Sequence, residues 1–131
     1  MAVPVCIETP TKFARYTVAD GVAIPLHTML KVAEPHLASA ATGNGEAFAG
    51  IAWEEKTLSD GLTQITVAKN GMWDIQDAGG LGDSAGAIVV MSGANLIRDA
   101  VAADLLTGSV VGKREKDAAA SEVTRIRLVG Y

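Results

Sequence analysis

The chain has 131 residues, a formal net charge of −4 and a hydrophobic fraction of 49%, while aromatic residues make up only 5%. This length fits one compact domain that needs no disulfide, and the acidic balance disfavours binding to nucleic acid or to anionic membranes. The single cysteine, Cys6, excludes an internal disulfide and is typical of a reducing compartment.

The first 20 residues alternate loosely between apolar and polar side chains and contain Pro4 and Pro10. Each proline removes a backbone donor and disfavours helix in the residue before it. We therefore expect residues 1–20 to form an extended N-terminal arm that has no partner strand, ahead of a single β-rich domain over residues 21–131. The arm lacks the basic start and apolar block of a signal peptide, and no apolar run approaches the roughly 20 residues of a membrane span.

The middle of the chain predicts a β-meander. Residues 21–33 predict two strands broken near Pro25, and a loop follows them. Asn70-Gly71 is a strong signal for a two-residue hairpin turn, because both residues tolerate positive φ. The three predicted strands of the meander are 47–57, 62–69 and 72–75.

The last third of the chain adds two predicted strands, 87–93 and 121–131, with an ambiguous stretch at 94–106 between them. The apolar residues of this stretch follow helical spacing. A weak internal echo instead favours a strand at 95–99, with a short helical piece confined to 98–106. In this internal repeat the stretch 95–100 corresponds to 29–33. Three pairs of residues also correspond: Ile24 and Ile88, Gly50 and Gly112, and Ile65 and Ile126.

No set of residues predicts a reaction centre. His27 and His36 lack the further ligands that a metal site needs, and Cys6 lies in an extended segment without a paired base. The glycine-rich stretch 79–86 leads into a β-branched strand rather than a helix, so it does not fit a phosphate-binding loop. We therefore expect no enzymatic activity, no metal and no cofactor.

Two further patterns indicate contacts between proteins. The apolar fraction is high for one small core, and both faces of the strands in 62–75 are partly apolar, which predicts a homo-oligomer. The basic cluster at 113–117 is nearly cancelled by interleaved acids, so it predicts a solvated face or a rim of salt bridges between subunits. The candidate residues for the subunit interface are Trp53, Met72 and Trp73.

The chain resembles the head decoration (capsid-stabilising) proteins of tailed phages, of the phage lambda type. The resemblance is carried by "IPLHTMLKVA" (24–33) and, after a variable loop, by "EAFAGIAWEEKTLSDGLTQITVAKNGMWDI" (46–75). A second module, from "GDSAGAIVVMSGANLIRDA" (82–100) to "SEVTRIRLVGY" (121–131), looks like the ending of the same family. The resemblance lies in strand order and glycine placement, and it covers most of residues 21–131.

This resemblance implies a mainly β fold, a small barrel or sandwich of the β-tulip type with little helix. It implies a homotrimer on the outer surface of the virion capsid, made in the host cytoplasm, without enzymatic activity or cofactor. Its partners are the major capsid protein and other copies of the chain, with no nucleic acid and no membrane. The N-terminal arm contacts the capsid in this family, and the candidate residues here are Val3, Val5, Ile7, Phe13 and Tyr16.

Two other interpretations stay open. A structural protein of a phage tail or baseplate would share the β-rich, cofactor-free character but assemble with a different symmetry. A small β-barrel module that binds a ligand would use Trp53 and Trp73 to line its pocket.

Overall fold

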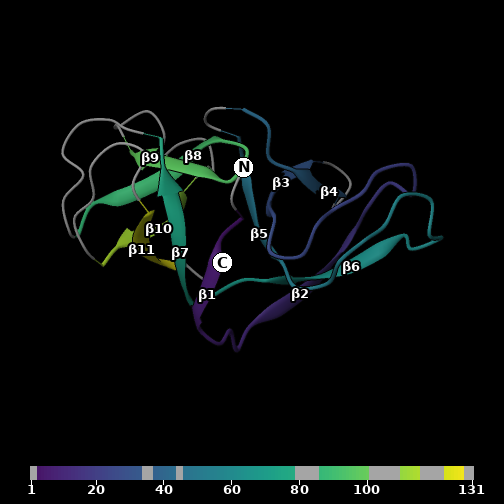
Figure 1. The fold of residues 1–131 in the computed structure, drawn as a ribbon, viewed down its shortest axis with the longest axis horizontal. Helices are drawn as coiled ribbons and strands as arrows, with labels where there is room; N and C mark the ends of the chain where they lie inside the picture. Colours follow the sequence, from purple (N-terminus) through teal and green to yellow (C-terminus); the bar gives the residue numbers. More distant parts are fainter. Residues whose placement is uncertain are drawn as a thin grey trace.

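The computed structural model describes residues 3–33, 37–43, 46–78, 86–100, 110–115 and 123–128. Every regular element within these ranges is a β-strand, and the strands form two small closed barrels that lie side by side (Figure 1). The first barrel contains β2 (Phe13–Thr17), β3 (Met29–Ala33), β4 (Leu37–Ala40), β5 (Phe48–Ala52) and β6 (Gln64–Ala68). The second contains β7 (Met72–Asp77), β8 (Ile88–Gly93), β9 (Leu96–Asp99), β10 (Val110–Arg114) and β11 (Val123–Leu128), and β1 (Val5–Glu8) is added to β7.

The two barrels have one topology. In the first barrel the strands follow the order β2, β4, β3, β5, β6, and β6 pairs again with β2. In the second they follow the order β7, β9, β8, β10, β11, and β11 pairs again with β7. All neighbours are antiparallel except β2 with β4 and β7 with β9. The chain therefore contains two copies of one five-stranded module.

The strand registers extend the repeat to single residues. Thr17 pairs with Leu37 in the first barrel, as residues 76 and 96 pair in the second, 59 positions later. Leu30 pairs with Gly50 in the first barrel, and the residue 59 positions after Leu30, residue 89, pairs with Gly112 in the second. Gly112 therefore corresponds to Gly50, and the offset between β5 and β10 is 62 positions. We call residues related in this way counterparts.

Backbone hydrogen bonds outside the ladders obey the same correspondence. The His27 N–H donates to the Ala52 oxygen at 2.9 Å, and the N–H of its counterpart, Gly86, donates to the Arg114 oxygen at 2.9 Å. Both donors have positive φ, 65° for His27 and 91° for Gly86. The module therefore requires a left-handed residue at this place, and His27 adopts it despite the cost of about 1–2 kcal/mol for a residue with a Cβ.

The predicted echo identified this repeat with a partly wrong register. Gly50 and Gly112 are counterparts, as predicted. Ile88 corresponds to Met29 rather than to Ile24, and β9 corresponds to β4 rather than to the strand at 29–33. The loops before and after β5 differ in length from those around β10, so a single offset cannot align all the strands.

Each barrel is filled by alternate side chains of its strands, as a sheet that is half buried requires. Buried residues of the first barrel include Tyr16, Val18, Ile24, Leu30, Ala38, Ala49, Ile65 and Val67. In the second barrel the cluster includes Ile75, Val89, Met91, Ile97, Val111 and Ile126. Both cores consist mainly of aliphatic side chains.

The two cores meet at a junction. Met29, Ile51 and Ala68 neighbour one another across β3, β5 and β6, and each has 0% of its surface exposed. They belong to the hydrophobic cluster of the second barrel rather than to that of the first. The Met29 N–H also donates to Asn95 Oδ1 of the second barrel at 2.9 Å. The apolar outer face predicted for the meander is therefore covered by the other half of the same chain.

The N-terminal segment has partner strands, contrary to the expectation of a separate arm over residues 1–20. β1 pairs antiparallel with β7, and β2 pairs with β6 along its whole length. Tyr16 and Val18 then fill the first barrel. Both prolines lie outside these strands: Pro4 precedes β1, and Pro10 lies in the linker between β1 and β2. Removal of residues 1–16 would open the first barrel rather than trim an arm.

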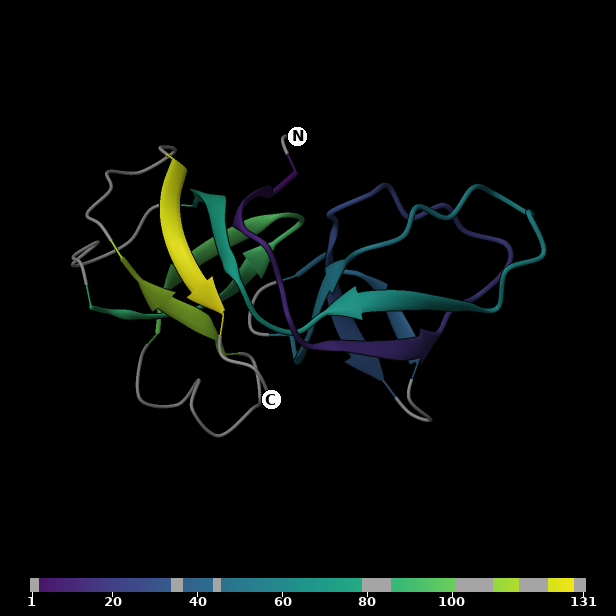
Figure 2. The same cartoon turned by 90° about the horizontal axis from the view of Figure 1, so that it is seen from below.

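The predicted hairpin at Asn70-Gly71 is wrong. Gly71 has the expected positive φ, 102°, but β6 and β7 belong to different barrels and do not pair. The turn instead passes the chain from one barrel to the other beside the linker between β1 and β2 (Figure 2). The Asn70 side chain connects this turn to the linker between β1 and β2, because its Oδ1 accepts the N–H of Thr11 at 2.8 Å and that of Lys12 at 3.0 Å.

The mainly β fold class is confirmed, and so is a strand at 95–99, where β9 lies. The helical piece predicted for 98–106 begins inside this strand, and residues 101–106 lie outside the described residues.

We expect Gly112→Ala to destabilise the protein. A Cβ at Gly112 would overlap the Arg127 carbonyl group across the β10–β11 ladder, and a Cβ at its counterpart Gly50 would overlap Val67 and the Ala68 carbonyl. Overpacking of this kind costs about 1–3 kcal/mol. Gly21→Ala is the control, because nothing lies within 4 Å of a Cβ there. Urea unfolding should show a lower midpoint for Gly112→Ala and Gly50→Ala alone; equal midpoints for all three variants would contradict the barrel registers.

Candidate functional site

Apolar side chains project from the N-terminal residues into solvent. Val3, Val5 and Ile7 are 37%, 57% and 42% exposed, while Cys6, between them, packs against the core of the second barrel. The alternation follows from the strand: β1 turns one side to the barrel and the other outward. Val3, Val5 and Ile7 are called the β1 patch.

β1 also has a free edge. Every other strand in the described part of the chain pairs with at least two neighbours, whereas β1 pairs with β7 alone. Closed barrels have no edges to offer another chain, so this edge is the place in the described fold where a further strand can be added. The β1 patch lies along it.

β1 is fixed to the second barrel by side chains as well as by its ladder. The Arg127 guanidinium pairs with Glu8 at 3.2 Å and with Glu115 at 3.1 Å. The predicted basic cluster is thus resolved into ion pairs within the chain, including Arg125 with Asp74 at 3.0 Å. Residues 116 and 117 of that cluster lie outside the described residues.

The remaining two candidates for capsid contact, Phe13 and Tyr16, differ in exposure. Phe13 is 44% exposed at the start of β2, whereas Tyr16 is only 7% exposed. The Tyr16 hydroxyl accepts a hydrogen bond from Lys69 Nζ at 2.8 Å inside the first barrel. Tyr16 is therefore a core residue, and Phe13 is available to a partner.

The aromatic side chains gather at the junction of the barrels. The Trp53 ring lies 6.1 Å from the Trp73 ring in an edge-to-face arrangement and 5.7 Å from Phe13. His27 lies against both tryptophans, 5.5 Å from Trp53 and 5.0 Å from Trp73. Burial lowers the pKa of His27, so the imidazole is neutral at physiological pH.

The three predicted interface residues are placed differently. Trp73 is 0% exposed and its Nε1–H donates to the Asn70 oxygen at 3.2 Å, so it has no surface for another subunit. Trp53 and Met72 are partly exposed and stay candidates. The buried position of Trp73 also leaves a ligand no face of its ring to stack on.

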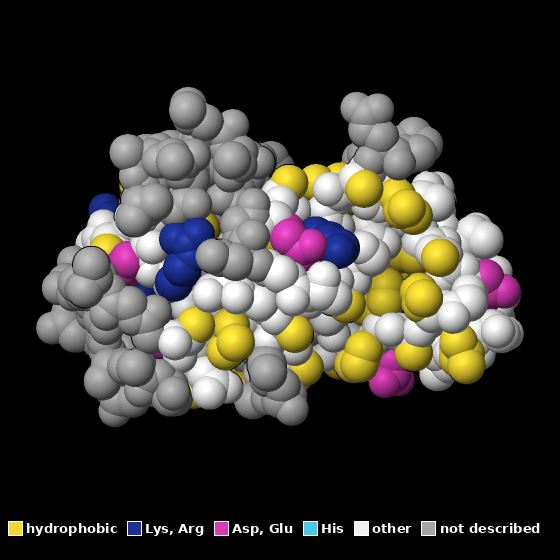
Figure 3. Space-filling model, turned by 90° about the horizontal axis from the view of Figure 1, so that it is seen from above, with side chains coloured by type: hydrophobic (Ala, Val, Ile, Leu, Met, Phe, Trp, Pro, Cys, Tyr) yellow, Lys and Arg dark blue, Asp and Glu magenta, His cyan; other side chains and the backbone are white. Residues whose placement is uncertain are grey.

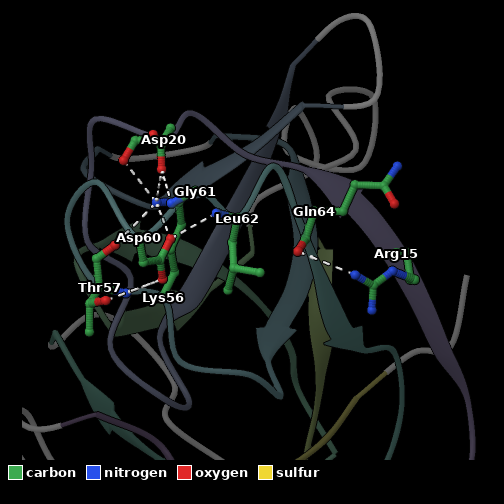
Figure 4. A network of polar contacts seen from close by, with 8 residues as sticks. All are labelled: Arg15, Asp20, Lys56, Thr57, Asp60, Gly61, Leu62 and Gln64. Atoms are coloured by element: carbon green, nitrogen blue, oxygen red, sulfur yellow. Dashed lines mark hydrogen bonds and ion pairs between the residues drawn. The ribbon is translucent and has the colours of Figure 1, made fainter.

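A buried lysine organises the far end of the first barrel (Figure 4). The Lys56 side chain is 0% exposed, and its Nζ donates to the Asp20 backbone oxygen at 2.8 Å and the Thr57 oxygen at 3.2 Å. Its ion pairs are with Asp20 at 3.4 Å and Asp60 at 3.2 Å. Nothing in the sequence marks this site, because Lys56 follows Glu54 and Glu55 at the end of the predicted strand 47–57, where a lysine is normally solvated.

The loops held by Lys56 expose further apolar residues. Val22, Leu58 and Leu62 are 42%, 65% and 38% exposed. Figure 3 shows hydrophobic side chains spread over the half of the molecule that the first barrel forms.

Arg114 forms a buried ionic cluster in the second barrel. Its guanidinium pairs with Asp77 at 2.6 Å and with Asp99 at 2.7 Å, and the side chains of Arg114 and Asp77 are 0% exposed. Burial opposes the charge, but the hydrogen bonds to Asp99 and Asp77 outweigh it and raise the pKa of Arg114. The basic cluster that contains Arg114 was predicted to form a solvated face or a rim of salt bridges between subunits, whereas Arg114 is buried within the chain. The counterparts of this cluster in the first barrel are Ala52, Val18 and Ala40.

In the described part of the chain, the groups considered for chemistry have the following partners. The Cys6 thiol donates to the Glu8 carbonyl at 3.5 Å rather than to an imidazole, and burial raises its pKa. No group of three His, Cys, Asp or Glu side chains within these residues could hold a metal ion. His36 and residues 79–85 of the glycine-rich stretch lie outside the described residues.

No protein-family model matches the chain, and no curated protein sequence matches it significantly. Among the described residues, no helix is long and apolar enough to cross a membrane.

We expect acid to destabilise the first barrel through Asp60. The N–H of Leu62 above all, with that of Thr57 and with Lys56, lowers the pKa of Asp60 to about 2. An unfolded aspartate titrates near about 3.9, so this stabilisation is complete above that pH and is lost as the pH falls towards 2. The free energy of unfolding of Asp60→Asn should be lower at neutral pH and vary less between pH values of about 4 and 2.

Glu55→Gln, on the same exposed loop, is the control and should keep the pH dependence of the parent chain. Glu46 also has its pKa lowered to about 2, chiefly by its hydrogen bond with Lys31, so some acid sensitivity remains in Asp60→Asn. An Asp60→Asn variant with an unchanged acid profile would show that the Lys56 network is not formed in solution.

Proposed function

We propose that this protein is a structural protein of a tailed-phage virion that binds the outside of the capsid and stabilises the shell. The observation that carries the proposal is the β1 patch beside the free edge of β1. Exposed aliphatic side chains along an unpaired strand form an adhesive surface, which native proteins leave open mainly where a partner covers it. The resemblance of the chain to head decoration proteins supplies the partner, the major capsid protein.

The attachment uses a strand that is already formed. β1 is ordered on β7 before any partner arrives, so a capsid strand that pairs with its free edge pays the ordering entropy of one segment rather than two. Backbone hydrogen bonds give such strand addition its affinity, and alternate side chains give it register. Val5 and Ile7 point outward at alternate positions and can fill hollows in the capsid surface.

Stabilisation follows from mass action. A protein that binds the assembled shell but not its dissociated subunits shifts the equilibrium towards the shell, by about 2.7 kcal/mol at a free concentration of 100 times its Kd. No reacting group is needed for this role.

The trimer at local three-fold positions rests on the family resemblance. The two-faced strands that indicated an oligomer are used at the junction inside the chain, so they no longer support a subunit interface. Phe13, Trp53 and Met72 retain exposed surface, and these residues are the contacts we propose between subunits. A tail or baseplate role would use the same patch on a different protein.

The test is co-sedimentation with expanded, undecorated capsids assembled from the major capsid protein of a tailed phage that encodes this chain. The double variant Val5→Glu/Ile7→Glu should keep its melting temperature, because both side chains are exposed, and should lose affinity at least about tenfold. Burying one aliphatic side chain contributes about 1.5–3 kcal/mol, and tenfold corresponds to about 1.4 kcal/mol.

The matched control is Val22→Glu/Leu58→Glu, which places two glutamates on equally exposed apolar residues of the far loops. It should bind capsids like the parent chain. Full occupancy by the Val5→Glu/Ile7→Glu variant would show that the β1 patch is not the attachment surface. Absence of binding by the parent chain would contradict the capsid role itself.

A further inference from the structure

The face of the first barrel that packs against the second barrel is a row of apolar residues. They neighbour one another across three strands, all are fully buried, and Trp53 extends the row just beyond β5. We call it the junction row, and its members are Met29, Ile51 and Ala68.

The second barrel has a counterpart of this row. Ile88 pairs with Lys113, and Lys113 pairs with Arg127, in the register of the junction row. The N–H of Glu115 donates to the Arg125 oxygen at 2.8 Å, as the N–H of its counterpart Trp53 donates to the Thr66 oxygen at 2.9 Å. We call Ile88, Lys113 and Arg127 the outer row.

The two rows have the same place in the module but opposite chemistry. Ile88 remains apolar and is 44% exposed. Lys113 and Arg127 hold the other two positions of the outer row, and Glu115 replaces the tryptophan that extends the junction row. Arg127 pairs with Glu115 and with Glu8, and these three side chains are 47%, 39% and 56% exposed.

A barrel docked on the outer row would have to take these charges out of water. Desolvating an ion costs more than its attraction to a partner returns unless the geometry is very good, whereas the junction row loses nothing on burial. The charges therefore oppose the contact that the same face makes in the first barrel.

We infer that Lys113, Glu115 and Arg127 prevent the outer row from accepting a barrel of a second copy of this chain. Repeat proteins need a polar outer face on the terminal module to remain soluble. A contact between the second barrel of one copy and the first barrel of the next is head-to-tail, so it would continue into filaments unless it closed into a ring. The three charged side chains therefore prevent the second barrel of one copy from binding the first barrel of another.

The experiment gives the outer row the residues of the junction row. The triple variant Lys113→Ile/Glu115→Trp/Arg127→Ala should form species larger than the parent chain's own assembly state, increasing with concentration, in light scattering after size exclusion. The matched control is Lys12→Ile/Glu55→Trp/Arg15→Ala, the same three exchanges at exposed residues outside both rows.

Association of the triple variant without association of the control supports the inference. Equal association of both would overturn it, because it would reflect added hydrophobicity rather than this face. Lys113→Ile alone provides a second test that leaves the ion pairs of Arg127 intact, and it should associate more weakly but measurably. Parent-like behaviour of both the triple and the single variant would also overturn the inference. Capsid binding enters none of these outcomes, so the proposed function can fail while this inference stands.

Discussion

The packing of one barrel on the other is the interaction on which the rest of the structure depends. Met29, Ile51 and Ala68 lie on the outside of the first barrel, where a lone barrel of this size would expose them to water. Burial of an aliphatic side chain contributes about 1.5–3 kcal/mol, which is large beside the 5–15 kcal/mol or so by which domains are stable. Neither module is therefore expected to be stable without the other.

β1 connects this packing to the proposed function. β1 precedes the first barrel in the chain but pairs with β7 of the second barrel, and β2 pairs with β6 of the first. Residues 5–17 therefore connect the two barrels. A partner that binds the free edge of β1 acts on both barrels at once. Two barrels joined in this way suit a protein whose proposed role is to hold other subunits in place.

The sequence predicted local features well and long-range pairing poorly. Alternating β-branched residues identified β6 and β11, because the two-residue period of a strand can be seen in neighbouring residues of the sequence. Asn70-Gly71 identified a turn, but nothing near it shows that β6 and β7 enter different barrels, so the predicted hairpin failed. The place of Tyr16 in a core could not be predicted for the same reason: its partner strand lies about 50 residues away. Arg114 pairs with Asp77 of a distant strand and Lys56 pairs with Asp20 of a distant loop, and composition alone assigns such residues to the surface.

The junction can be tested by following unfolding with two probes. Trp53 and Trp73 face each other across it, one from each barrel, with ring centroids 6.1 Å apart. Tryptophan fluorescence therefore reports the contact between the barrels, while far-ultraviolet circular dichroism reports the strands within them. If the barrels depend on each other, the two signals change together in a single urea transition. A fluorescence transition at a clearly lower urea concentration, with the strands still intact, would show barrels that separate before they unfold and would contradict this account.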